Sequence, residues 1–239
     1  MPRAVITVSL LCLLFSGRAG AEDTWKAKPV HEWSREETQR FLGQSPWVKK
    51  VAVGGSLVAS LPPAGGSVET TAGRRESSGA EGGTSSTTVD AEPGRQMGAV
   101  YYVEWSSAKI VRQARLHIAA LRGEVKEEGE VAPLDAYIVM VSGPDMKAFD
   151  AITEAQLAAG ASLRAKRSNL ALAPLEVKIR KTTEGRMVAI QLAFSRISNG
   201  QPTLSDQEKS VDFACKVRGL AIKASFNLSK MTTEEGRDL

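Results

Sequence analysis

The chain has 239 residues, 42% of them hydrophobic, and a formal net charge of +4. A chain of this length can bury one sizeable core. Two of the basic residues, Arg3 and Arg18, lie in a segment that we expect to be removed, so the mature chain is close to neutral. A protein that binds nucleic acid normally shows a concentrated basic face. The near-neutral charge therefore disfavours a protein that binds nucleic acid.

Residues 1–21 have the parts of a secretory signal peptide. A positive start at Arg3 is followed by an almost uninterrupted apolar run over residues 4–17, and Ala19-Gly20-Ala21 places small residues where a signal peptidase cleaves. The run is shorter than the roughly 20 residues that a membrane-spanning helix needs, and no second run of that length follows. The sequence predicts cleavage before Glu22, no transmembrane span, and export to a periplasm or the cell exterior.

Residues 22–61 are predicted to form an N-terminal helix and the first strand of the domain. Ser34 and Glu37 have the spacing of a capping box, which begins a short helix. The strand spans Val48 to Ser60 and is weakened at Gly54-Gly55.

Residues 62–98 are predicted to be a disordered linker or an insertion between two strands. Glycine, serine, threonine and proline make up more than half of this segment, and large apolar residues are nearly absent. Such a composition buries too little surface to offset the entropy of ordering the chain.

Residues 99–230 are predicted to form the main domain. Ala99 to Trp105 and Ala136 to Val141 are apolar on both faces, which is typical of central strands. Between them, Ser107 to Leu121 has one apolar stripe and reads as an amphipathic helix that stops at Gly123.

A second main helix is predicted from Ser142 to about Ala159, with Ser142 as its cap and Pro144 in its first turn. Ser142-Gly143 also follows a strand, as a nucleophile or phosphate-binding turn would. The G-x-S-x-G pattern is absent, however, and Asp145 would repel an anion there, so the residues favour capping.

The last third of the chain is predicted to be rich in strands, with a short strand at 161–165 and alternating strands at 188–194, 211–217 and 220–228. Gly219 should turn the last two into a hairpin, and residues 231–239 should be a flexible tail. The predicted class is α+β: one mixed, mostly antiparallel sheet of about six strands, two main helices on one face and the short N-terminal helix at an edge.

Four motifs occur along the chain in an order that resembles a family of uncharacterised exported bacterial proteins. The first is Trp33-Ser34-x-x-Glu37, then Leu42, then Ser45-Pro46-Trp47. The others are Val103-x-Trp105-x-Ser107-Ala108-x-x-x-Arg112-x-Ala114, Tyr137-x-Val139-x-Val141-Ser142-Gly143 and Lys223-x-x-Phe226-x-Leu228-x-x-Met231. The resemblance implies export and a shared fold, and it carries no known activity, cofactor or catalytic residue.

Residues with catalytic or metal-binding chemistry are scarce. His31 lies in an expected loop, His117 borders the apolar helix stripe, and neither has a Cys/His/Asp ligand set nearby, so no metal site and no cofactor are predicted. Cys12 is lost with the signal peptide, which leaves Cys215 without a disulfide partner. Cys215 alternates with apolar residues of its strand, which favours a buried, inert thiol over a nucleophile.

Two groups of residues are candidates for a binding surface. Trp25, Trp33 and Trp47 would form a sugar or peptide platform if exposed, but the sequence favours Trp33 and Trp47 as packing anchors of the short helix. Arg164, Lys166 and Arg167 form a basic concentration that could contact an anionic lipid or polymer, although a solvated hairpin end is the favoured interpretation.

Three functions remain open from the sequence. The favoured one is a non-catalytic envelope or secreted interaction module, because export and an ordinary core are predicted and no catalytic constellation is found. The second is a domain that binds a small ligand, a sugar or a lipid. The third is a hydrolase that uses scattered carboxylates such as Glu104 and Asp135.

Overall fold

The computed structural model describes residues 24–53, 98–125, 129 and 131–239. The predicted signal peptide, the predicted linker except Gly98, and the second half of the strand expected at Val48–Ser60 lie outside these residues. The two strands that flank the linker in sequence are antiparallel neighbours, with Val53 opposite Ala99.

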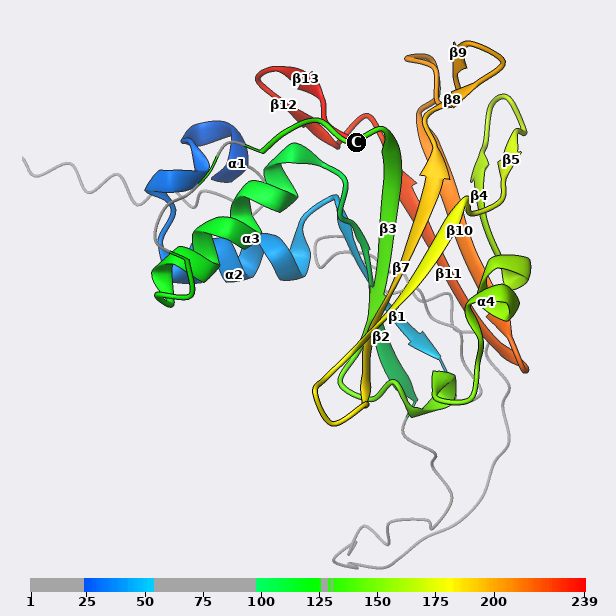
Figure 1. Cartoon of the computed structure of the whole chain (residues 1–239). Helices are drawn as coiled ribbons and strands as arrows, with labels where there is room; N and C mark the ends of the chain where they lie inside the picture. Colours follow the sequence, from blue (N-terminus) through cyan, green and yellow to red (C-terminus); the bar gives the residue numbers. More distant parts are fainter. Residues whose placement is uncertain (1–23, 54–97, 126–128, 130) are drawn as a thin grey trace, which may run out of the picture.

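The described residues form three layers (Figure 1). The middle layer is a five-stranded sheet with the order β1-β2-β3-β7-β6. These strands are β1 (Val48–Val53), β2 (Ala99–Trp105), β3 (Ala136–Ser142), β7 (Met187–Ser195) and β6 (Glu176–Lys181).

A second sheet of four strands packs against one face of the first and has the order β11-β10-β4-β5. Its strands are β11 (Leu220–Asn227), β10 (Ser210–Val217), β4 (Ala161–Ala165) and β5 (Ala171–Leu172). Two small hairpins complete the strands, β8 (Ile197–Ser198) with β9 (Gln201–Pro202) and β12 (Thr232–Thr233) with β13 (Gly236–Arg237).

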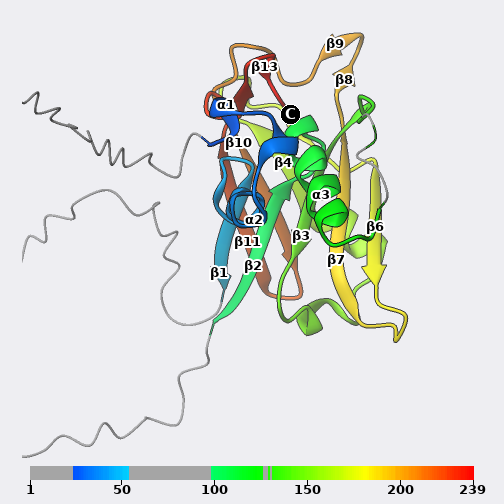
Figure 2. The ribbon, with the colours of Figure 1, turned by 90° about the vertical axis from the view of Figure 1, so that its left-hand side faces the viewer.

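Helices cover the other face of the five-stranded sheet, in front of it in Figure 2. They are α1 (Thr24–Ala27), the 3-10 turn η1 (Val30–Glu32), α2 (Arg35–Gln44) and α3 (Lys109–Leu121). Helix α2 packs against α3 and the edge strand β1. On that face, Arg115 of α3 binds Glu104 of β2 through two contacts, at 3.0 and 2.7 Å.

The α+β class and the antiparallel character are confirmed, but the single mixed sheet of about six strands is wrong. The strands lie in two main sheets, and every pairing among the described strands is antiparallel. Alternation along a strand predicts which face is buried, but it does not predict which strand lies alongside. The inner faces of the two sheets bury each other.

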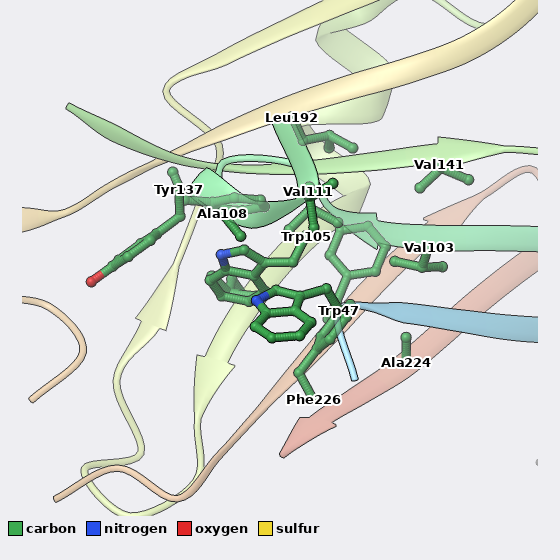
Figure 3. Packing of buried hydrophobic residues seen from close by; sticks show 14 of the residues in the cluster. Trp47, Val103, Trp105, Ala108, Val111, Tyr137, Val141, Leu192, Ala224 and Phe226 are labelled. Atoms are coloured by element: carbon green, nitrogen blue, oxygen red, sulfur yellow. The ribbon is translucent and has the colours of Figure 1, made fainter. Parts of the chain in front are cut away.

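Aromatic side chains join the two sheets in the core (Figure 3). The ring of Trp105 on β2 lies 5.3 Å from that of Phe226 on β11, with the rings nearly perpendicular. Phe194 on β7 meets Phe213 on β10 in the same manner at 6.5 Å. Such edge-to-face pairs add to the free energy gained by burying the rings.

The N-terminal capping box is confirmed. The Ser34 hydroxyl accepts a hydrogen bond from the Glu37 amide at 3.2 Å, and the Glu37 carboxylate accepts one from the Ser34 amide at 2.7 Å. The β10–β11 hairpin is also confirmed. Arg218 and Gly219 both have positive φ, 45° and 82°, as a two-residue type I′ turn requires.

The helix predicted from Ser142 to about Ala159 is wrong. Ser142 belongs to β3, a short 3-10 turn η2 (Lys147–Phe149) follows, and helix α4 spans only Glu154–Gly160. The helix begins at a second capping box, in which Thr153 and Gln156 bind each other's backbone amides. Helix α4 contacts β10 and β6 and does not join the helical layer, so only one of the two predicted main helices lies on the outer face.

The predicted flexible tail at residues 231–239 is also wrong, because these residues form the β12–β13 hairpin and bind the domain. The Asp238 carboxylate accepts hydrogen bonds from the backbone amides of Lys109 and Ile110, at 2.7 and 2.8 Å. Helix α3 needs this carboxylate, because its own N-cap residue is Ala108, which has no capping side chain. The Trp47 indole N–H donates to the Asp238 carbonyl at 2.7 Å.

Helix α4 approaches β10 so closely that position 160 has to be glycine. A Cβ atom there would lie 2.0 Å from the Lys216 carbonyl oxygen. We therefore expect Gly160→Ala to lower the free energy of unfolding by about 1–3 kcal/mol, the usual cost of overpacking, as measured by urea denaturation.

Gly43→Ala is the matched control, because a Cβ atom at this helical position meets nothing within 4 Å. It should raise the stability by roughly 0.5–1 kcal/mol, since alanine loses less backbone entropy than glycine in a helix. Equal effects of the two substitutions would contradict the close approach of α4 to β10.

Candidate functional site

A groove of about 810 Å³ lies between the α1–η1 segment, the first turns of α3 and the β12–β13 hairpin. These three parts meet at one end of the domain, at the top of Figure 1. Charged and polar side chains form much of its lining. The lining residues are Trp25, Lys26, Ala27, Lys28, Pro29, Val30, His31, Lys109, Ile110, Gln113, Leu116, Gly129, Thr233, Glu234, Glu235, Arg237 and Asp238.

Aromatic packing holds the α1–η1 wall in place. The ring of Trp25 lies 5.8 Å from that of Phe41 and 5.7 Å from that of Trp47. Trp33 lies 4.9 Å from Phe41, and its indole N–H donates to the Lys28 carbonyl at 3.0 Å. The wall is therefore fastened to helix α2 at both of its ends.

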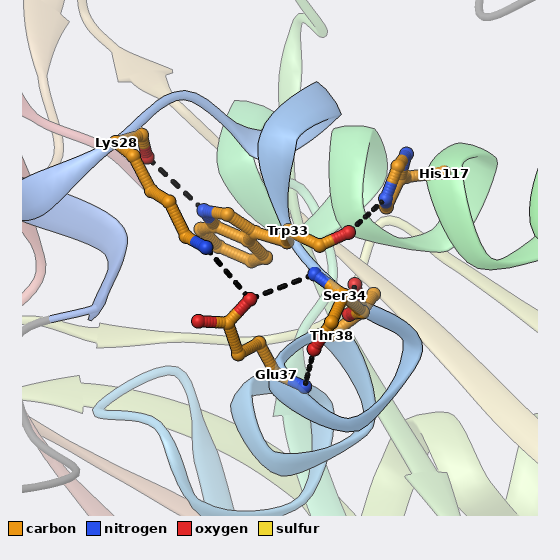
Figure 4. Close-up of polar contacts among 6 residues, drawn as sticks. All are labelled: Lys28, Trp33, Ser34, Glu37, Thr38 and His117. Atoms are coloured by element: carbon orange, nitrogen blue, oxygen red, sulfur yellow. Dashed lines mark hydrogen bonds and ion pairs between the residues drawn. The ribbon is translucent and has the colours of Figure 1, made fainter.

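Polar contacts fix the same wall to both long helices (Figure 4). The Lys28 ammonium contacts the Glu37 carboxylate at 2.8 Å. His117 of α3 lies with its Nε2 atom 2.8 Å from the Trp33 carbonyl, and because a carbonyl can only accept, Nε2 donates. The hydrogen bond from Lys28, together with that from the Ser34 amide, lowers the pKa of Glu37 to about 2.

The β12–β13 wall is fixed by Arg237 and Asp238. The Arg237 guanidinium donates to the carbonyls of Ser205, Asp206 and Glu208. Asp238 caps α3, and Lys109 at the start of that helix forms an ion pair with Glu235 at 2.8 Å. The floor and the acidic wall of the groove are thus tied together.

The exposed charges of the groove differ between its walls. The α1–η1 wall carries the basic Lys26 and Lys28 and the imidazole of His31, whereas the hairpin wall carries the exposed carboxylates of Glu234 and Glu235, with Arg237 and Asp238 bound to backbone groups. A partner that bears charges of both signs, placed across the groove, would match this arrangement.

The three tryptophans considered for a binding platform are buried. The exposed fractions are 8% for Trp25, 2% for Trp33 and 0% for Trp47, and all three belong to the hydrophobic core. None offers an exposed indole face, although Trp25 forms part of the groove lining. Their geometry is that of packing anchors.

The predicted basic concentration lies in β4 and the turn that follows it, and it does not line the groove. Arg164 donates to the Asn169 side chain at 3.3 Å, and Lys166 forms an ion pair with Asp212 at 3.1 Å. The backbone amides of Arg167 and Ser168 donate to Glu208. Burial acts to raise the pKa of Glu208, but these hydrogen bonds outweigh burial and hold the pKa below its usual value.

The side chains considered for catalysis or metal binding do not form one cluster. Cys215 is buried in the core as predicted, and burial raises the pKa of its thiol to about 11, so it is protonated at neutral pH. His117 is buried, whereas His31 is exposed at the groove. The Glu104 carboxylate is buried against Arg115, and Asp135 is exposed.

Within the described ranges, no three or more His, Cys, Asp or Glu side chains are grouped so that they could hold a metal ion. Of the groove residues, the sequence indicated only Trp25 as a candidate for binding. The hairpin wall was missed for a specific reason, which concerns Glu234, Glu235, Arg237 and Asp238. They lie in the predicted tail, where two-residue strands leave no periodic pattern.

The tryptophans should affect stability without any ligand. Trp33→Ala and Trp47→Ala should each lower the free energy of unfolding by about 3–5 kcal/mol, the usual cost of deleting a buried ring. The sequence alone predicts a neutral Trp25→Ala, because Trp25 lies near the expected mature N-terminus. The ring contacts now predict a destabilising one.

Phenylalanine variants separate packing from hydrogen bonding. Trp33→Phe and Trp47→Phe lose indole bonds to carbonyls, whereas the Trp25 indole N–H has no partner among the described residues. Trp25→Phe should therefore be the mildest of the three in thermal melting, and thermally silent alanine variants would contradict the packing role.

The Glu37 contact predicts a pH dependence of stability. Because the pKa of Glu37 falls from 4.5 to about 2 on folding, its contribution is complete above pH 4.5 and is lost as the pH falls toward 2. Glu37→Gln should flatten the dependence of the urea midpoint on pH in this window, and Glu36→Gln, one residue earlier in the same helix, should not. Identical pH profiles for the wild type and Glu37→Gln would refute the contact.

No helix in the described part of the chain has the length and apolar character to cross a membrane. Comparison with known proteins gives no relative, since no protein-family model matches the chain and no curated protein or solved structure is significantly similar to it. The family suggested by the sequence motifs stays a prediction.

Proposed function

We propose that this protein is an exported, non-catalytic interaction module and that its partner binds in the groove between α1–η1, α3 and β12–β13. The observation that carries the proposal is the placement of polar groups in that groove, with Lys26, Lys28 and His31 on one wall and the exposed carboxylates of Glu234 and Glu235 on the other. The partner would be a polar polymer or polypeptide that carries both amino and carboxylate groups.

Two of the carboxylates support a non-catalytic role, although His31 and Glu234 are exposed at the groove. Acid–base catalysis needs a carboxylate or imidazole free to exchange a proton near the substrate. Glu104 is held by Arg115 outside the groove, and Asp238 is held by the α3 amides. The charges of the groove therefore serve to bind the partner.

A small polar ligand is the second candidate. The groove volume of about 810 Å³ falls within the usual range of small-molecule sites, about 300–1,000 Å³. The mixed charge of the lining favours a zwitterionic or polar molecule over a lipid tail, which would need an apolar lining.

Co-sedimentation with purified peptidoglycan sacculi, which carry both amino and carboxylate groups, tests the proposal. Glu234→Lys and His31→Glu change one wall each and should both reduce the bound fraction several-fold. Asp150→Lys is the matched control, because Asp150 is exposed and lies outside the groove lining, and it should bind like the wild type.

Anionic phospholipid vesicles and a panel of small zwitterions serve as the alternative probes. Equal binding by the wild type and both wall variants, or binding to none of these probes, would contradict a groove-centred module. Hydrolysis of the sacculi by the wild type, abolished by one carboxylate substitution, would instead identify an enzyme.

A further inference from the structure

A lysine projects into the seam between the two sheets. Lys49 on β1 lies opposite Val103 on β2. Residues directly opposite each other in an antiparallel pair share a face, so Lys49 points with Val103 toward the second sheet. There its Nζ atom lies 5.9 Å from the centre of the Phe226 ring on β11.

The seam is formed by two strand edges. Strands β1 and β11 lie beside each other but are the edge strands of separate sheets, with no ladder between them. Lys49 is only partly exposed, and the Phe226 ring beneath it is fully buried. The ammonium group thus lies on an aromatic floor at the mouth of the seam.

Lys49 differs from other lysines of the protein in its partners. Lys28, Lys109 and Lys166 each form an ion pair with a carboxylate. Among the residues that the structure describes, no acidic side chain forms an ion pair with Lys49, and the charge of Lys230, just beyond β11, acts on it. Burial, with a smaller effect from the charge of Lys230, lowers the pKa of Lys49.

We propose that Lys49 is a reactive-amine site at the β1–β11 seam that condenses with small anionic aldehydes, the charge of Lys230 attracting the anionic group. The inference is independent of the groove and of the function assigned to it. The ammonium group of Lys230 attracts an anionic reagent more strongly than a neutral one, because opposite charges attract. A neighbouring cation is also one of the features that activate a lysine amine as a nucleophile.

The chemistry is a Schiff-base condensation. The Lys49 ammonium first releases a proton to solvent, and the neutral amine attacks the aldehyde carbon to form a C–N bond. The resulting carbinolamine takes up a proton on its hydroxyl group and loses water, which leaves a protonated imine. Borohydride, added as a reagent, supplies the hydride that reduces this imine to a stable secondary amine.

The test treats the folded full chain with limiting pyridoxal 5′-phosphate, reduces it with borohydride and maps the modified lysines by mass spectrometry. Lys49 should be labelled several-fold faster than Lys50, the matched control, which is the next residue on the same strand, faces the opposite side and is more exposed. Lys49→Arg, which keeps the charge, should remove the fast phase of labelling, and Lys50→Arg should not.

Pyridoxal without its phosphate group tests the contribution of Lys230. In the wild type, pyridoxal 5′-phosphate should label Lys49 faster than pyridoxal does. The ratio of these two rates should fall several-fold in Lys230→Ala. Thermal melting of each variant verifies that it is folded. Two results would overturn the proposal. One is faster labelling of the more exposed Lys50 than of Lys49, and the other is a fast phase of labelling that persists in Lys49→Arg.

Discussion

The structure depends on the contacts of Asp238 at the start of helix α3. Its carboxylate binds the amides of Lys109 and Ile110, and its carbonyl accepts the Trp47 indole N–H. The Trp47 carbonyl in turn accepts the Trp105 amide of β2 at 2.8 Å. Three regions far apart in the sequence, at Trp47, at residues 105–110 and at Asp238, are therefore joined by a few hydrogen bonds. A helix whose own N-cap is alanine gains its missing acceptor from a segment more than a hundred residues away.

The groove is a consequence of these contacts. Lys109 begins the helix that lines its floor, Glu235 binds Lys109 from the hairpin wall, and Trp25 on the other wall packs against Trp47. The side chains that shape the groove are thus held by the same residues that hold the core together. A binding surface supported in this manner is preorganised, which reduces the entropy lost when a partner binds.

Local signals in the sequence predicted the local structure. The Ser34–Glu37 capping box, the alternation that buries Cys215 and the turn at Gly219 all depend on residues close in sequence. Contacts over long sequence distances could not be predicted in this manner. The division into two sheets depends on which edges meet, and the cap of α3 depends on Asp238, in a segment without periodicity. Thr153 and Gln156 also have the spacing of a capping box, and this local signal, rather than Ser142, marks the start of α4.

Amide hydrogen exchange at the start of α3 tests the central role of Asp238 most directly. In the wild type the Lys109 and Ile110 amides should exchange slowly, because both donate to the Asp238 carboxylate. In Asp238→Ala the two amides should lose their protection, while those in the middle of α3 keep theirs, and the stability should fall by about 0.5–2 kcal/mol, as for loss of a helix cap. Unchanged protection of Lys109 and Ile110 in the folded variant would contradict the account.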